Sequence, residues 1–194
     1  MRNLINLSNT LTMSRILLTP VFLYLIFAKN GYGQALALVV FAMCSLTDLY
    51  DGKLARQDGT VSKFGRFLDP LADKILISSA LISFVFLGIV KAWLVAAIVI
   101  RDVIITILRS YAIYQGKQVI TSKLSKWKTT IEWVTVLLVL AFINLKVVLA
   151  KLEFDTWFLL DDMWSYWLLN GLIAAAMLLA LVSGIGYLRD HYRF

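Results

Sequence analysis

The sequence predicts an all-α integral membrane protein with six transmembrane helices preceded by an N-terminal interfacial amphipathic helix. Three observations support this fold class: the composition, a series of long apolar stretches, and the distribution of basic residues between them. Of the 194 residues, 60% are hydrophobic and 16% are charged, and the mean hydropathy is +0.80. Soluble domains have about 45 to 50% apolar and about 25% charged residues. The composition therefore argues against a soluble globular protein.

The amino-terminal segment, residues 1–13, mixes aliphatic side chains with polar neighbours. It is too short and too polar to cross a bilayer, so we expect a helix that lies along the membrane interface. A secretory signal is the alternative, because an apolar run follows. Lys29 and Asn30 stand where such a signal would have small residues before its cleavage site. We therefore expect this segment in the mature protein.

Long apolar stretches follow, and each approaches the roughly 20 residues that a helix needs to cross a bilayer. They lie at residues 14–29, 35–56, 63–90, 92–115, 127–150 and 165–187. No repeat, linker or low-complexity tract separates them. We therefore predict a single membrane domain over residues 1–194, with a six-helix bundle at 14–190.

The basic residues predict the orientation of this bundle. Six spans place both termini on one side, and that side would hold Arg2, Arg15, Lys53, Arg56, Lys63, Arg66, Lys117, Lys123, Lys126, Lys128, Arg189 and Arg193. Lys29, Lys91, Lys146 and Lys151 would lie toward the other side. By the positive-inside rule, the termini and the even-numbered connections are cytoplasmic, as in a bacterial inner membrane protein. The net charge of +7 fits this cytoplasmic rim, and we expect no nucleic-acid partner.

Four aspartates lie inside the second and third apolar stretches: Asp48, Asp51, Asp69 and Asp73. A carboxylate at the centre of a bilayer costs about 2.5 to 3.5 kcal/mol, so these side chains are expected to face a compensated internal cavity. Helical spacing places Asp48 and Asp51 on one face and Asp69 and Asp73 on another. Two antiparallel neighbouring helices could therefore bring all four carboxylates together near the cytoplasmic side.

Carboxylates in such a small volume repel one another unless they are protonated or bridged by cations. Hard oxygen donors select magnesium, manganese or calcium, so the sequence predicts a site for one or two divalent metal ions. The small residues Gly52, Ala55 and Gly65 share these helix faces. They allow either two helix backbones or a ligand to come close. Simple helix packing is the alternative explanation of the small residues, but it does not explain the aspartates.

These residues resemble the signature of the CDP-alcohol phosphotransferase family. The segment Asp48-x-x-Asp51-Gly52-x-x-Ala55-Arg56 is followed after eight residues by Gly65-x-x-x-Asp69-x-x-x-Asp73, and every position of the family pattern is present. Near the amino terminus, Asn9-x-x-Thr12-x-x-Arg15 followed by Pro20 resembles the opening of that family. With the six spans, the resemblance covers nearly the whole chain.

The resemblance implies an enzyme that joins an alcohol to the phosphatidyl group of a CDP-linked lipid and releases CMP. Asp48, Asp51 and Asp69 would hold two divalent ions, Mg²⁺ or Mn²⁺. Asp73 would complete the metal site and accept the proton of the attacking hydroxyl. The family also implies a homodimer surrounded by membrane lipids. A further set of residues would bind the CDP-lipid: Gly52, Ala55, Arg56, Gly65, Asn9 and Thr12.

The acceptor alcohol is predicted from basic residues farther along the chain. Arg101 and Arg109 lie on about one face of the fourth apolar stretch, and Lys126 and Lys128 follow near the start of the fifth. Arg101 falls near mid-membrane, where it must be paired or functional. Lys126 is also explained as a positive-inside charge, or as a contact to anionic lipid. We expect these residues to bind the phosphate of the acceptor, chiefly through Arg109 and Lys128.

The pattern Arg101-Asp-x6-Arg109 with Lys126-x-Lys128 resembles the branch of the family that uses CDP-diacylglycerol and sn-glycerol 3-phosphate to make phosphatidylglycerophosphate. The Asp at position 102 also resembles the eukaryotic-type cardiolipin synthases, whose acceptor is phosphatidylglycerol. The second cation, Arg109, favours a phosphomonoester acceptor. A divalent-cation transporter is a more distant alternative, because it would leave Arg56 and the small residues without a function.

Overall fold

The structure is a computed structural model that describes residues 7–28, 32–58, 65–115, 123–152 and 162–191. Within these ranges the chain forms six α-helices and short turns, which confirms the predicted all-α class. The helices are α1 Leu7–Phe27, α2 Gly33–Asp58, α3 Gly65–Phe86, α4 Ala92–Tyr114, α5 Lys123–Lys151 and α7 Asp162–His191. Each helix overlaps one of the six apolar stretches of the sequence.

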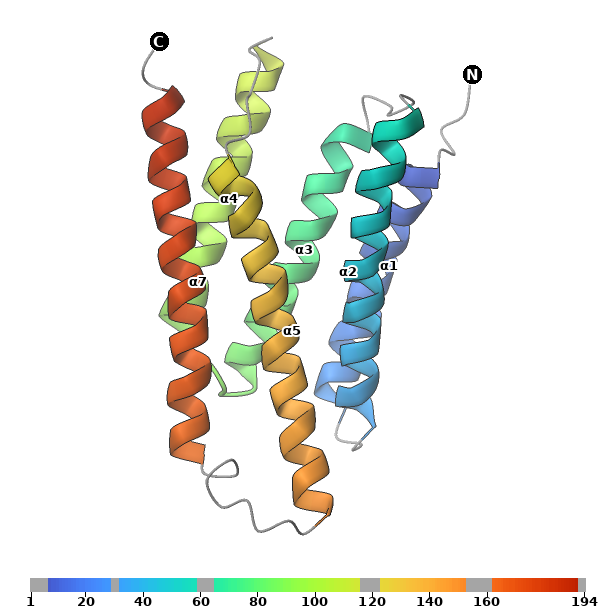
Figure 1. The fold of residues 1–194 in the computed structure, drawn as a ribbon, viewed down its shortest axis with the longest axis vertical. Coiled ribbons are helices and arrows are strands. Elements are labelled where there is room, and N and C mark those ends of the chain that lie inside the picture. The colour runs from blue at the N-terminus through green and yellow to red at the C-terminus, as the bar shows by residue number, and fades with distance from the viewer. Residues whose placement is uncertain (1–6, 29–31, 59–64, 116–122, 153–161, 192–194) are drawn as a thin grey trace.

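The helices run alternately up and down along one direction (Figure 1). The amino ends of α1, α3 and α5 and the carboxyl ends of α2, α4 and α7 lie toward the same end of the bundle. Helix α1 packs against α2 and α3, and α4 packs against α3 and α7. Helix α5 contacts α2, α3 and α7 and thus joins the two halves of the bundle. This alternation places the carboxyl end of α2 and the amino ends of α3 and α5 toward one end.

Helix α1 is longer than the sequence predicted. It is continuous from Leu7 to Phe27, whereas the sequence predicted a boundary between an interfacial helix and a first span near residue 13. No glycine or proline occurs between Leu7 and Pro20, so nothing interrupts the backbone hydrogen bonds there. Residues 1–6 lie outside the described residues. The interfacial location of the amino-terminal segment stays a prediction.

The turn between α3 and α4 is set by a glycine and anchored to α7. Gly88 has φ of 72°, and the amides of Gly88 and Ile89 donate to the carbonyls of Val85 and Phe84 at 2.9 and 3.0 Å. This is the hydrogen-bond pattern of a Schellman motif, in which glycine takes the left-handed conformation. Asn170 of α7 accepts a hydrogen bond from the Lys91 amide at 2.8 Å. The turn thereby orients α4 beside α7.

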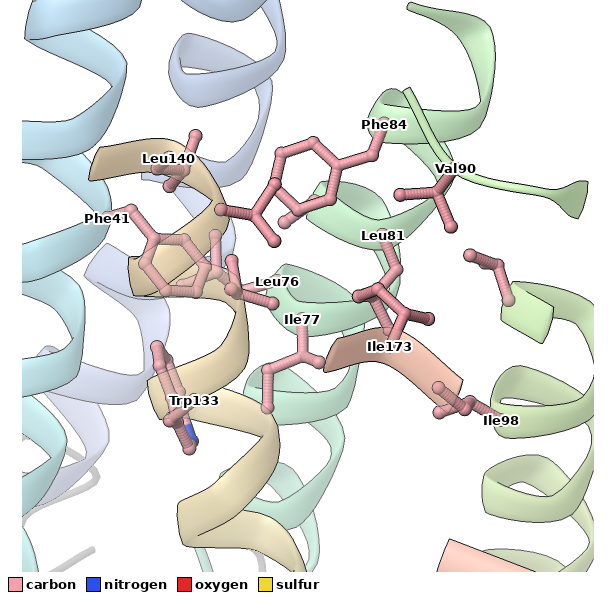
Figure 2. Close-up of a cluster of buried hydrophobic side chains, with 14 of the residues drawn as sticks. Phe41, Leu76, Ile77, Leu81, Phe84, Val90, Ile98, Trp133, Leu140 and Ile173 are labelled. Carbon is pink, nitrogen blue, oxygen red and sulfur yellow. The ribbon is translucent and has the colours of Figure 1, made fainter. Parts of the chain in front are cut away.

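The hydrophobic core runs through the centre of the bundle and draws on every described helix. Figure 2 shows Leu76, Ile77, Leu81 and Phe84 of α3 surrounded by side chains of the other helices. The rings of Phe41 and Trp133 lie 5.0 Å apart between centroids. These contacts fix α3, which bears Asp73, between α1, α4 and α5.

The outer surface of the bundle is also apolar. Tyr24 and Phe86 are 77% and 78% exposed, and many other large hydrophobic side chains face outward. Among the described residues, two helical segments are long and apolar enough to cross a membrane, Trp127–Lys151 and Met163–Tyr187. Met13–Phe27 and Gly33–Thr47 are shorter apolar segments. An apolar surface of this extent indicates a membrane environment, since soluble monomers rarely expose large contiguous apolar patches.

Candidate active site

The acidic motif lies on α2 and α3, near the carboxyl end of one helix and the amino end of the other. Asp48 and Asp51 belong to the last turns of α2, and Asp69 belongs to the first turns of α3. Both helices have the form that the spacing argument requires, with the end of α2 and the start of α3 at the same end of the bundle (Figure 1). The side chains of these three residues lie outside the described part of the structure. Their convergence with Asp73 stays a prediction.

The residues predicted to bind the CDP-lipid have helical backbones, but their side chains also lie outside the described part of the structure. Asn9 and Thr12 lie in α1, Gly52, Ala55 and Arg56 lie in α2, and Gly65 begins α3. These three helices are neighbours through α1, which packs against both α2 and α3.

Asp73 is the member of the acidic motif whose side chain the structure describes, and it forms an ion pair. Nη1 of Arg15 in α1 donates to Oδ1 of Asp73 in α3. Arg15 is 1% exposed, and a buried guanidinium of this kind requires a compensating carboxylate. The pair therefore joins the amino-terminal helix directly to the acidic motif. The sequence indicated Arg15 through its spacing from Asn9 and Thr12, but it did not indicate this partner.

A second group of buried charges joins α3, α4 and α5, and we call it the ion cluster: Lys74, Arg101, Asp102, Lys128 and Glu132. Asp102 is its centre. Nη1 of Arg101 lies 2.8 Å from Oδ1 of Asp102, and Nζ of Lys128 lies 2.5 and 2.6 Å from the two carboxylate oxygens. Lys128 and Asp102 are 5% and 6% exposed. Hydrogen bonds between ionised groups are the strong ones, so this arrangement holds the two cations together.

The other members of the ion cluster extend it along α3 and α5. Nζ of Lys74 donates to the backbone carbonyl of Asp102 at 3.0 Å and to the hydroxyl of Thr106. Oε1 of Glu132 lies 2.5 Å from Nζ of Lys128, one helical turn away in α5. Lys74 directly follows Asp73, so the two side chains leave α3 in different directions. Asp73 reaches α1 while Lys74 reaches α4.

The structure brings together some of the predicted acceptor residues and leaves others apart. Arg101 and Lys128 share Asp102, which agrees with the expectation that Arg101 is paired. Arg109 is half-buried on α4 and forms no ion pair with another described residue. The side chain of Lys126 lies outside the described residues. Lys128 uses its donors on two carboxylates, so its role in binding an acceptor would require one of these contacts to be shared.

Sequence reasoning missed Lys74, Glu132 and the partners of Arg101 on α7. Ser183 accepts a hydrogen bond from Nη2 of Arg101 at 3.2 Å. The four-residue spacing of Lys128 and Glu132 was a readable signal, since oppositely charged residues one turn apart pair on a helix. No local signal connected Ser183 with Arg101, because the two residues are 82 positions apart.

The chemistry of the acidic motif fits hard divalent cations, because it offers four carboxylates on two helices. The described part of the structure contains no group of three or more His, Cys, Asp or Glu side chains that could hold a metal ion. The side chains of Asp48, Asp51 and Asp69 lie outside that described part. The donor set is therefore suitable in kind for hard divalent cations.

The chain is similar in sequence to several known proteins. The chain is 42% identical over 114 residues to the "Probable phosphatidylglycerophosphate synthase" of Mycobacterium tuberculosis, a match over 57% of this chain and 54% of the relative. It is 35% identical over 163 residues to the CDP-diacylglycerol–glycerol-3-phosphate 3-phosphatidyltransferase of Bacillus subtilis, over 77% of this chain and 83% of the relative. It is also 40% identical over 102 residues to a "Probable cardiolipin synthase (CMP-forming)" of Drosophila melanogaster, over 52% of this chain and 31% of the relative.

The match thus spans about half the length of the mycobacterial relative and most of the Bacillus one. The model of one protein family matches residues 5–185, a range that includes the acidic motif, Arg15 and the ion cluster. On the strength of this match over nearly its whole length, the chain belongs to the CDP-alcohol phosphatidyltransferase family.

Proposed function

We propose that the protein transfers the phosphatidyl group of CDP-diacylglycerol to sn-glycerol 3-phosphate, giving phosphatidylglycerophosphate and CMP. Family membership supports a phosphatidyl transfer. The name of the Bacillus relative states this donor and this acceptor, and the name of the mycobacterial relative states the product. The structural observation that carries the acceptor assignment is the ion cluster.

The ion cluster places three basic side chains against two acidic ones inside the bundle. With all five groups ionised, it has an excess of positive charge in a buried setting, where an additional anion is favourable. Arg109 follows Asp102 by seven residues and Thr106 by three on α4, so it shares their helix face. A phosphorylated acceptor would meet Arg101 and Arg109 from α4 and Lys128, with Lys126, from α5.

The acidic motif would bind the donor. Asp48, Asp51, Asp69 and Asp73 would hold two divalent ions, Mg²⁺ or Mn²⁺. When bound, such ions neutralise the diphosphate and stabilise the leaving CMP. Gly52, Ala55, Arg56 and Gly65, with Asn9 and Thr12, would line the CDP-lipid pocket. The small residues let the nucleotide approach the helix backbones, and Arg56 offers a cation to the diphosphate.

In the transfer step, a hydroxyl oxygen of glycerol 3-phosphate attacks the phosphorus of the phosphatidyl group. A new oxygen–phosphorus bond forms, the bond from that phosphorus to the oxygen of CMP breaks, and CMP leaves with the bonding electrons. Asp73 accepts the hydroxyl proton. The guanidinium of Arg15 would orient the Asp73 carboxylate through their ion pair.

The bundle would sit in a bacterial inner membrane as six spans. Both chain ends, the acidic motif and the junction α4–α5 would then face the cytoplasm, where CMP and glycerol 3-phosphate are soluble. The acyl chains of the donor would remain among membrane lipids. We further propose a homodimer, as the family resemblance implies.

Transfer of radiolabelled sn-glycerol 3-phosphate tests this function. Purified protein is supplied with CDP-diacylglycerol and Mg²⁺, and both labelled lipid and released CMP are measured. Equal amounts of labelled phosphatidylglycerophosphate and CMP are expected, with Asp73→Asn as the inactive control. The absence of labelled lipid from the active preparation would refute the assignment.

Cardiolipin synthesis is the second candidate, and the Drosophila relative favours it. Phosphatidylglycerol offered as a competing acceptor separates the two reactions in the same assay. If the product is cardiolipin and glycerol 3-phosphate does not react, the donor assignment stands and the acceptor assignment fails.

A further inference from the structure

Helix α7 makes a close contact with the guanidinium of Arg101. Ser183 accepts a hydrogen bond from Nη2 of Arg101 at 3.2 Å. At the next position, Gly184 lies so near the same side chain that an added Cβ would stand 3.0 Å from Nε and 3.5 Å from Cγ of Arg101. Both Ser183 and Gly184 are buried. The Arg101 side chain thus passes close beside Gly184 and reaches Ser183 of α7.

This contact fixes one side of the guanidinium while Asp102 holds the other. Nη1 of Arg101 lies 2.8 Å from Oδ1 of Asp102. The two terminal nitrogens of the guanidinium are therefore bound to different helices, Nη1 to α4 and Nη2 to α7. Nε is buried and has no hydrogen-bond partner among the described residues, since it faces Gly184. A planar guanidinium held in this way has one orientation, unlike the flexible ammonium of a lysine.

We propose that Ser183 and Gly184 are positioning residues, through which α7 sets the guanidinium of Arg101 for recognition of the acceptor phosphate. The proposal rests on the function proposed above and deepens it. It assigns a role to α7, which bears no residue of the acidic motif. The ligand would be a phosphate monoester, and Gly184 leaves room beside Nε of Arg101 that an added Cβ, at 3.0 Å, would crowd.

The physical reason is the lack of space at Gly184. A separation of 3.0 Å is shorter than ordinary carbon–nitrogen contacts between non-bonded atoms, so a methyl group there forces Nε to move. Nε lies in the middle of the Arg101 side chain, and its displacement moves both nitrogen atoms beyond it. A shift of a few tenths of an ångström would weaken the hydrogen bonds to Ser183 and Asp102, since such bonds are sensitive to misalignment.

The chain provides a matched control two residues away. Gly186 also lies inside α7, and an added Cβ there meets nothing within 4 Å. Gly184→Ala and Gly186→Ala make the same change in helix propensity and in composition. They differ in whether the new methyl group meets Arg101.

The experiment measures steady-state kinetics of the full-length protein with sn-glycerol 3-phosphate and CDP-diacylglycerol as varied substrates. Gly184→Ala is expected to raise the KM for glycerol 3-phosphate about three- to tenfold, as the weakening of one or two hydrogen bonds to a charged group allows. Its KM for CDP-diacylglycerol should stay within about twofold of the wild type. Gly186→Ala should change neither constant, and Ser183→Ala should show a smaller rise in the KM for the acceptor.

A double-mutant cycle separates positioning from general damage to the fold. Arg101→Met removes the group that Gly184 positions, so Gly184→Ala should have no further effect on the acceptor KM in that background. Additive effects of the two substitutions would overturn the proposal. Equal acceptor KM values for Gly184→Ala and Gly186→Ala would also overturn it.

These results differ from failure of the proposed function itself. If the wild-type protein does not transfer to glycerol 3-phosphate, that function fails and the role of α7 in phosphate recognition fails with it. If the wild type transfers normally and Gly184→Ala behaves like the wild type, the role of α7 alone is refuted. Thermal unfolding of each purified variant shows whether an altered KM comes from a protein that is still folded.

Discussion

Asp102 is the residue on which the buried cations converge, so Asp102→Asn is the most direct test of the ion cluster. The carboxylate lies within 2.8 Å of a nitrogen of Arg101 and within 2.6 Å of Nζ of Lys128 through both oxygens. Asparagine keeps the volume but loses the charge. Lys74, Arg101 and Lys128 would then face a single carboxylate, Glu132.

Removing one partner of a buried ion pair costs about 3 to 5 kcal/mol, because the other charge is left uncompensated. Since Glu132 still contacts Lys128 and the asparagine oxygen can still accept a hydrogen bond, we expect the lower end, about 3 kcal/mol. For a chain of this size, 1 kcal/mol lowers the unfolding midpoint by about 2 to 4 °C, so the expected decrease is roughly 6 to 12 °C.

The assay is thermal unfolding of the purified protein in detergent, followed by tryptophan fluorescence. Glu132→Gln is the comparison, because Glu132 contacts Lys128 alone within the ion cluster, and its midpoint should fall less. An Asp102→Asn midpoint within about 2 °C of the wild type would refute the reasoning, as would a larger decrease for Glu132→Gln.

Three further predictions concern other parts of the molecule. Asp73→Asn should abolish turnover while CDP-lipid binding persists, because the base is lost and the nucleotide pocket remains; normal turnover would contradict its role. Arg109→Ala should chiefly raise the KM for a phosphorylated acceptor, and an unchanged KM in the radiolabel assay would move phosphate recognition elsewhere. Gly33→Ala should lower the unfolding midpoint, because its Cβ would stand 2.7 Å from Cβ of Ala28 and from a backbone oxygen. Gly171→Ala, where an added Cβ meets nothing within 4 Å, is its control, and equal midpoints would show that the α1–α2 junction can relax.

The sequence predicted the helices well because their signal is local. Each apolar stretch became a helix within a few residues of its expected bounds, as the length of α4, Ala92–Tyr114, illustrates against the predicted 92–115. The boundary near residue 13 was the exception. A mixed polar segment can equally begin a longer helix, and only the absence of a helix-breaking residue before Pro20 decided the matter.

The candidate site likewise contains residues that the sequence revealed and contacts that only the structure revealed. The acidic motif could be found from the sequence because its members lie close together along the chain, and helical periodicity alone assigns them to faces. The pairing of Arg15 with Asp73 spans 58 positions, and no periodicity connects them. Arg101 was expected to be paired or functional, since a lone charge in an apolar chain is costly. Its partner Asp102, at the neighbouring position, also pairs with Lys128. No argument from a single helix could reveal this second contact.

The sequence by itself determined the helical class, the apolar character of the bundle and the two helices that bear the acidic motif. These properties follow from composition and from spacings of three and four residues, which act within one helix. Only the tertiary structure decided that Lys128 meets Asp102 across 26 positions and that α7 confines Arg101 at Ser183 and Gly184. The reason is that buried charges choose their partners by the packing of whole helices. That packing depends on side-chain volume at every contact, including the absence of a side chain at Gly184.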